Sequence, residues 1–120
     1  MKAADLIEEA LSDSLVAMRE QRADDAVSLL RRVGPVAAGA GPLPHAAVLI
    51  RLAQARLAQC DHSVDRGEAA MRAAQAYAVA LDCLGRLRAG GGLQSSLGDR
   101  ATRLRLDAAD RLLALGDRAA

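Results

Sequence analysis

The residues most capable of chemistry lie close together in the stretch Cys60-Asp61-His62, with Asp65 just downstream and His45 upstream. Thiolate, imidazole and carboxylate groups bind transition metals and act as nucleophiles and bases. Zinc sites, however, space their ligands as C-x₂₋₄-C or H-x₃₋₅-H, and the adjacent letters C-D-H match neither pattern. Neighbours in a turn also point apart, and the sequence implies no third group that would orient a Cys/His pair. We interpret this stretch as a capped turn, and we expect no catalytic residue, no metal and no cofactor.

Three other groups of polar or small residues are explained by structure more simply than by a site. Carboxylates of the first half cluster near helix starts, where capping and the helix dipole account for them; they are Glu8, Glu9, Asp24 and Asp25. Glycines 90–92 precede a helix and could cradle a phosphate, but no strand precedes them and no Gly-Lys-Ser/Thr follows. The arginines of residues 100–111 are interleaved with Asp99, Asp107 and Asp110, which indicates a solvated, ion-paired face. No enzyme emerges from these patterns.

The composition is that of an ordinary soluble domain. Of 120 residues, 52% are apolar and 26% are charged, and the net charge of +1 argues against a nucleic-acid footprint. Tyr77 is the only aromatic residue, so the stacking surfaces of a single-stranded nucleic-acid binder are missing. Lys2 is the only lysine beside many arginines, a bias typical of a high-GC genome. Acidic residues occupy the N-terminal stretch where a signal peptide would be apolar, so we expect a cytoplasmic protein with reduced, buried cysteines.

Hydrophobic periodicity predicts two closely linked helices in the first 33 residues. Apolar residues recur at helical spacing over residues 3–20, and the acids of this segment lie toward its N-terminus. Residues 21–23 are expected to be a connection, and Asp24 is expected to cap a second helix. That helix should end before Gly34-Pro35, because proline lacks the N–H and crowds the preceding turn. Two helices with so short a link form an antiparallel hairpin.

The segment 34–44, GPVAAGAGPLP, holds all three prolines and predicts a crossover loop that lies across the bundle. A lid or a peptide-binding loop is the functional alternative. Helical spacing resumes at His45 and continues to a turn at 60–63, where Asp61 or Ser63 would cap the next helix. The chain is thus predicted to be one all-α domain made of a helical hairpin (3–33), the crossover (34–44) and a three-helix portion (45–116).

The stretch 63–88 is predicted to be the central helix of this domain. It contains no proline, and its apolar residues form two lines, so it can contact more than one neighbour. The first line comprises Val64, Met71, Ala74, Ala78, Leu81 and Gly85, and the second comprises Tyr77, Leu81 and Leu84. The many alanines allow neighbouring helices to approach closely. Glycines 90–92 are expected to end the helix.

Three segments resemble parts of tetratricopeptide-like helical hairpin repeats. RADDAVSLLRRV (22–33) is similar to the second helix of a unit, and RLLALGDRA (111–119) is similar to a closing turn. ARLAQCDHSVDRGEAAMRAA (55–74) resembles the end of one helix, the turn and the next helix. The turn-like elements follow no constant period, and the large aromatic positions of the repeat are missing. The resemblance implies a concave helical surface that holds a peptide or a partner domain.

Residues 44–115 also resemble flagellar and type III export chaperones. The likeness rests on Pro44 opening a helix, on a long alanine-rich helix, on the glycine break at 90–92 and on the letters LQSSLGDR before the last helix. The tyrosine-rich stretch expected in the last helix is absent, and the N-terminal hairpin is extra. This resemblance implies a chaperone that holds a helical segment of its client.

The sequence therefore predicts a five-helix antiparallel bundle, or a short TPR-like helical array, that acts as a non-enzymatic protein–protein interaction module. As an adaptor or scaffold it would bind another protein or form a homo-oligomer, with a dimer favoured, and it would bind neither nucleic acid nor membrane. An export or secretion chaperone is the alternative function. Apolar residues beyond what five helices can cover would form the partner-binding surface. We expect that surface to include Val36, Leu43, Tyr77 and Leu84.

Overall fold

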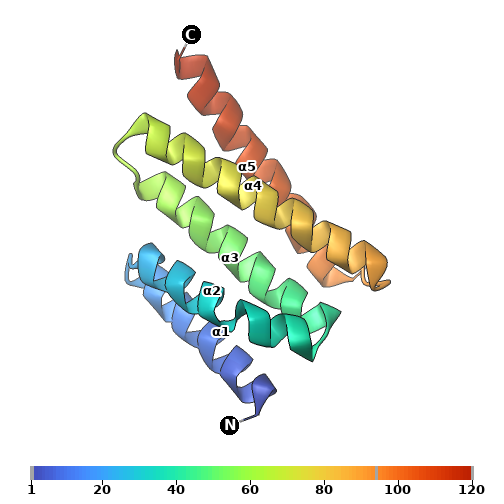
Figure 1. Ribbon diagram of the computed structural model, residues 1–120. Helices are drawn as coiled ribbons and strands as arrows, with labels where there is room; N and C mark the ends of the chain where they lie inside the picture. The colour runs from blue at the N-terminus through green and yellow to red at the C-terminus, as the bar shows by residue number, and fades with distance from the viewer. Residues whose placement is uncertain (1, 94, 120) are drawn as a thin grey trace.

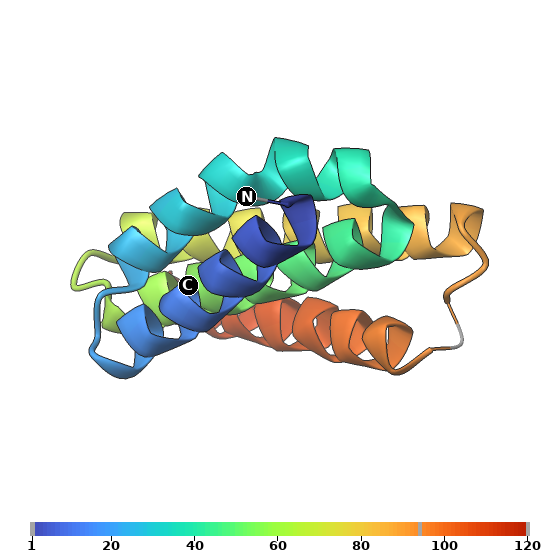
Figure 2. The same cartoon turned by 90° about the horizontal axis from the view of Figure 1, so that it is seen from below.

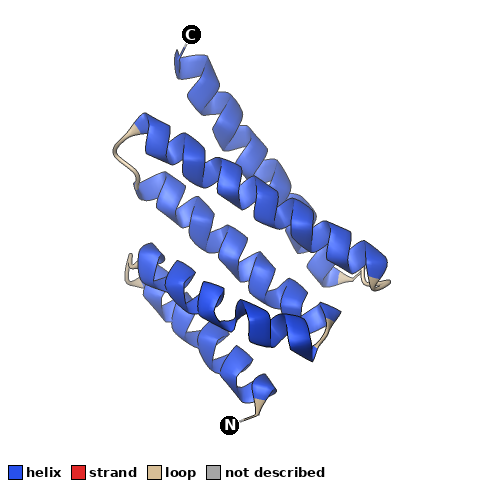
Figure 3. Ribbon diagram, viewed as in Figure 1, coloured by secondary structure: helices blue, strands red, loops and turns tan. Residues whose placement is uncertain are grey.

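The described residues form five α-helices that follow one another as antiparallel hairpins (Figure 1). The computed structural model describes residues 2–93 and 95–119, with side chains as far as residue 116. The helices are α1 (Ala3–Arg19), α2 (Ala23–Ala40), α3 (Pro42–His62), α4 (Arg66–Ala89) and α5 (Ser96–Ala119). All regular secondary structure in this part of the chain is helical (Figure 3), which confirms the predicted all-α class.

The five helices are arranged as a flat slab of two layers. The principal dimensions are 49 × 30 × 19 Å, and the shortest one accommodates two helices of about 10 Å diameter. α2 and α4 lie in one layer, and α1, α3 and α5 lie in the other (Figure 2). Each helix packs against the next one along the chain, and α3 also contacts α1 and α5. Consecutive helices therefore alternate between the layers, and within the described residues the backbones of α2 and α4 are not packed against each other.

α3, and not α4, is the central helix of the slab. α3 packs against all four other helices, whereas α4 packs only against α3 and α5 in the described chain. Two clusters of buried residues share α3: one joins it to α1 and α2 around Leu30 and Val48, and the other joins it to α4 and α5 around Ile50 and Leu87. α3 can serve both clusters because its buried residues lie on several sides. The prediction that 63–88 is the central helix is wrong, because α4 buries only one of its apolar sides.

The predicted crossover loop at 34–44 is helical except at Gly41. α2 continues through Gly34-Pro35, and α3 begins directly after Gly41. Pro35 removes one backbone hydrogen bond, but this proline is exposed while the nearby Val33 is buried in the cluster shared by α1, α2 and α3. Burial of that face offsets the lost hydrogen bond, so the helix does not stop. The chain turns instead at Gly41, whose φ of +138° favours glycine, and Pro42 then suits the first turn of α3.

The N-termini of α2 and α4 also differ from the prediction. Arg22, and not Asp24, occupies the N-cap position of α2, without a side-chain capping bond. Asp65 caps α4 in place of Asp61 or Ser63, because its carboxylate accepts a hydrogen bond of 2.8 Å from the backbone N–H of the third residue of the helix. The turn was predicted at 60–63, but residues 60–62 still belong to α3 and the connection lies at 63–65, so both the turn and its capping residue were placed too early in the chain.

Candidate functional site

α4 is rotated so that its alanine-rich side packs against α3 and α5. The buried residues of α4 recur at helical spacing and are mostly small: Ala69, Ala73, Ala76, Ala80, Cys83, Leu84 and Leu87. Small side chains allow two helices to approach closely, and close approach brings many atoms into van der Waals contact. The packing of α4 on α3 is the most extensive helix contact in the fold. Alanines therefore form the core side of this helix.

The opposite side of α4 carries a line of apolar residues exposed to solvent, here called the outer α4 line. It comprises Gly67, Met71, Ala74, Ala78, Leu81 and Gly85. Met71 is 47% exposed and Leu81 is 42% exposed. Exposed apolar residues are ordinary when they are scattered, but a continuous row of them on one helix face is a feature of interaction surfaces. Most of this row was recognised in the sequence, but as the apolar line of a central helix.

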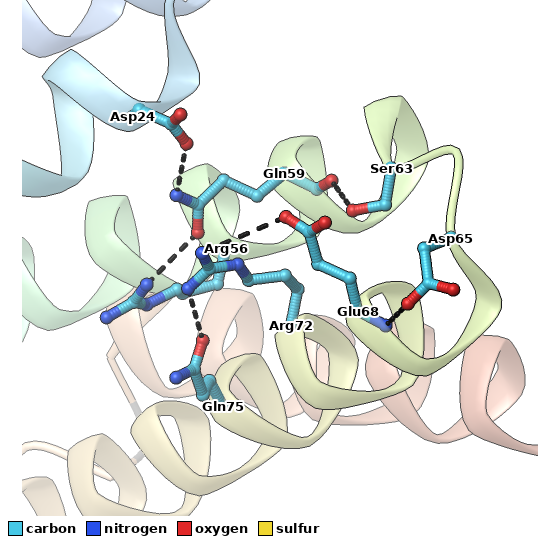
Figure 4. A network of polar contacts seen from close by, with 8 residues as sticks. All are labelled: Asp24, Arg56, Gln59, Ser63, Asp65, Glu68, Arg72 and Gln75. Carbon is cyan, nitrogen blue, oxygen red and sulfur yellow. Dashed lines mark hydrogen bonds and ion pairs between the residues drawn. The ribbon is translucent and has the colours of Figure 1, made fainter.

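Polar contacts of Arg72 lie beside the core side of α4. Arg72 Nη1 donates a hydrogen bond of 3.1 Å to Gln75 Oε1, and Arg72 Nη2 lies 4.0 Å from Glu68 Oε1 (Figure 4). Figure 4 shows the Arg72 side chain pointing toward Arg56 and Gln59 of α3. Burial, together with the nearby charge of Arg72, lowers the pKa of Arg56. The hydrogen bond to Gln75 and the approach to Glu68 lie within α4 and turn with the helix, so they do not set its rotation. The close packing of the alanine side on α3 leaves the outer α4 line in solvent.

Gln59 joins the start of α2 to the end of α3 beside the α3–α4 turn. This side chain is buried, and its Nε2 donates a hydrogen bond of 2.6 Å to Asp24 Oδ1. Its Oε1 accepts a bond of 3.1 Å from Arg56 Nη1, and its backbone oxygen accepts a bond of 2.7 Å from Ser63 Oγ (Figure 4). A buried amide is tolerated where its polar atoms are paired in this way. The network stabilises the end of the slab from which α4 begins.

The four residues predicted to bind a partner do not form one exposed surface. Leu84 is buried among α3, α4 and α5, and Tyr77 packs against the same cluster. Val36 packs against the cluster of α1, α2 and α3 and lines a groove of about 270 Å³ between α1 and α2. Leu43 is 53% exposed at the start of α3. The expectation that Leu84 is exposed is wrong, because the rotation that buries the alanines of α4 also turns Leu84 inward.

The residues considered for chemistry do not meet in one cleft. His45 lies in the first turn of α3 and His62 ends that helix, about 26 Å away along its axis. Asp61 accepts hydrogen bonds of 2.8 and 2.9 Å from Arg111 Nε and Nη2, and these bonds lower the pKa of its carboxyl. Cys60 is buried, and burial raises the pKa of its thiol. Among the described residues, no group of three or more His, Cys, Asp and Glu side chains could hold a metal ion.

Comparison with protein-family models, with curated proteins and with solved structures finds no match to this chain. The likeness to tetratricopeptide-like repeats and the likeness to export chaperones therefore stay predictions from the sequence. None of the helices in the described part of the chain combines the length and the apolar character needed to span a bilayer.

Proposed function

We propose that this protein is a non-enzymatic helical interaction module whose outer α4 line binds a helix of another protein molecule. The observation that supports the proposal is the exposure of Met71 and Leu81 on either side of two exposed alanines, Ala74 and Ala78. A helix laid along α4 would cover both large side chains and could come close to Ala74 and Ala78 between them. Covering apolar surface stabilises a complex by about 25 cal/mol for each Å² removed from water.

The surroundings of α4 support a binding surface that exists before the partner arrives. Its alanine side is packed on α3, Asp65 caps its first turn, and the hydrogen bonds of Gln59 hold the adjoining end of the slab. A surface that is already ordered loses little conformational entropy on binding, which leaves more of the contact energy for affinity.

Site-specific photo-cross-linking in the native host tests this function. A photo-reactive amino acid in place of Ala78 should form a covalent adduct with a protein, and Met71→Glu in the same chain should abolish the adduct. The matched control carries the photo-reactive residue in place of Ala114, an exposed alanine of α5. Failure to form any protein adduct from position 78, or an adduct that persists in the Met71→Glu chain, would refute the proposed function.

A further inference from the structure

We propose that the helix bound by the outer α4 line is α4 of a second copy of this chain, in an antiparallel pair. The inference rests on the proposed function and specifies its partner. Its basis is the symmetry of the line about position 76. Small residues lie at its centre, one large apolar residue follows on each side, and a glycine stands at each end. The pairs at equal distance from position 76 are Ala74 with Ala78, Met71 with Leu81, and Gly67 with Gly85.

An antiparallel pair centred on position 76 places the members of each pair opposite one another. Met71 of one copy then contacts Leu81 of the other at both ends of the interface, and Ala74 lies opposite Ala78 twice at its centre. Small residues at the centre allow the helix axes to approach to about 8 Å. The line spans about 27 Å from Gly67 to Gly85. A surface that is complementary to itself in this way suits a two-fold symmetric dimer.

The charges of α4 favour the antiparallel direction over the parallel one. The start of the helix holds two carboxylates and one arginine, Asp65, Glu68 and Arg66, and its last turn holds Arg86 and Arg88, with Asp82 one turn earlier. In the antiparallel pair each acidic start lies beside the basic end of the other copy, and the helix dipoles oppose one another. In a parallel pair the acidic starts of the two helices lie side by side, and so do their basic ends, which places like charges next to one another. The side chains of Glu68 and Arg86 are about half exposed and are paired within α4 with Arg72 and Asp82, so a second copy can reach them at the surface.

A single pair of helices gives an interface at the small end of the range for specific complexes. The dimer is therefore expected to dissociate on dilution. Sedimentation or light scattering from about 1 μM to about 1 mM covers the affinities that such an interface gives. The mass of the purified full chain should rise from one copy to two across this range and should not rise further, because a two-fold pair leaves no second outer α4 line open.

Substitutions on the outer α4 line should weaken this dimer, and a matched substitution elsewhere should not. Met71→Glu places a carboxylate opposite Leu81 at both ends of the interface and should raise the dissociation constant at least about tenfold. Leu106→Glu is the control, because Leu106 is a 53% exposed leucine on α5, outside the outer α4 line. A dimer that dissociates equally in both variants, or that is unaffected by Met71→Glu, overturns the inference.

Disulfide cross-linking tests the direction and register of the pair. Chains with Ala74→Cys mixed with chains with Ala78→Cys should form cross-linked dimers on oxidation, because these positions lie opposite one another. Either variant alone should cross-link poorly, because its two cysteines lie about 6 Å apart along the axis, in addition to the separation of the helices. Efficient cross-linking of each variant alone indicates a parallel pair and overturns the inference. The native cysteines are buried, and the unsubstituted chain measures their background.

These results separate the inference from the proposed function. A chain that stays monomeric across the concentration range overturns the second-copy inference. If the same chain still forms adducts from position 78 with a different protein, the proposed function stands. If it is monomeric and forms no adduct, both are refuted.

Discussion

The rotation of α4 can be tested by comparing Leu84→Ala with Leu81→Ala. Leu84 is 9% exposed and belongs to the cluster of α3, α4 and α5, whereas Leu81 is 42% exposed on the outer α4 line. Leu-to-Ala substitution in a core lowers the free energy of unfolding by about 2–5 kcal/mol, because transfer energy is lost and a cavity remains. At Leu81 about four-tenths of the residue is already in water and no enclosed cavity forms, so the loss should be about 1 kcal/mol or less.

The two substitutions are matched because both replace leucine with alanine in the interior of the same helix. The change in helix propensity is therefore the same and cancels in the comparison. We expect Leu84→Ala to lower the free energy of unfolding by about 2 kcal/mol more than Leu81→Ala does. For a chain of this length that difference corresponds to roughly 6–10 °C in Tm.

Urea unfolding followed by circular dichroism at low micromolar concentration measures both values. Dilution matters because self-association would stabilise the folded chain by mass action. Equal losses, or a larger loss for Leu81→Ala, would show that α4 buries the outer α4 line, and would refute the reasoning on which the binding surface depends.

Three further predictions concern buried or paired polar groups. Gln59→Leu removes the hydrogen bond to Asp24 and should lower the free energy of unfolding by about 1 kcal/mol. A urea midpoint equal to that of the unsubstituted chain would contradict this prediction. Asp61→Asn should cost at most about 1 kcal/mol at pH 7, because its ion pair with Arg111 is partly exposed and is screened by solvent. Since that pairing lowers the pKa of Asp61 in the folded state, its contribution is present above the ordinary aspartate pKa of about 3.9. The contribution is lost as the pH falls through the lower folded pKa, so urea titrations of the two chains should converge in acid and differ at neutral pH. Burial raises the pKa of Cys83 to about 11; a thiol reagent at pH 8 should therefore modify it only after unfolding, and rapid modification of the native chain would show that it is accessible.

Local patterns in the sequence predicted most of the helical segments but not all of their ends. The spacing of apolar residues gave α1 to within a residue, and the glycines at 90–92 marked the break before α5 correctly. Pro35 misled the prediction because the cost of a proline inside a helix is about 3 kcal/mol, and a sequence pattern cannot weigh it against burial. In the structure the side of α2 that carries Val33 is packed on its neighbours, and α2 continues to Ala40.

By itself the sequence determined that the chain is helical, where most of its turns lie, and that α4 carries more apolar residues than one neighbour can cover. Each of these is a property of residues that are close along the chain. Only the tertiary structure decided which side of α4 is buried and that α3 is the central helix. An alanine-rich helix can pack on more than one side, and the choice depends on close approach to α3 and α5. Those helices lie elsewhere along the chain, so the pattern within α4 could not contain the answer.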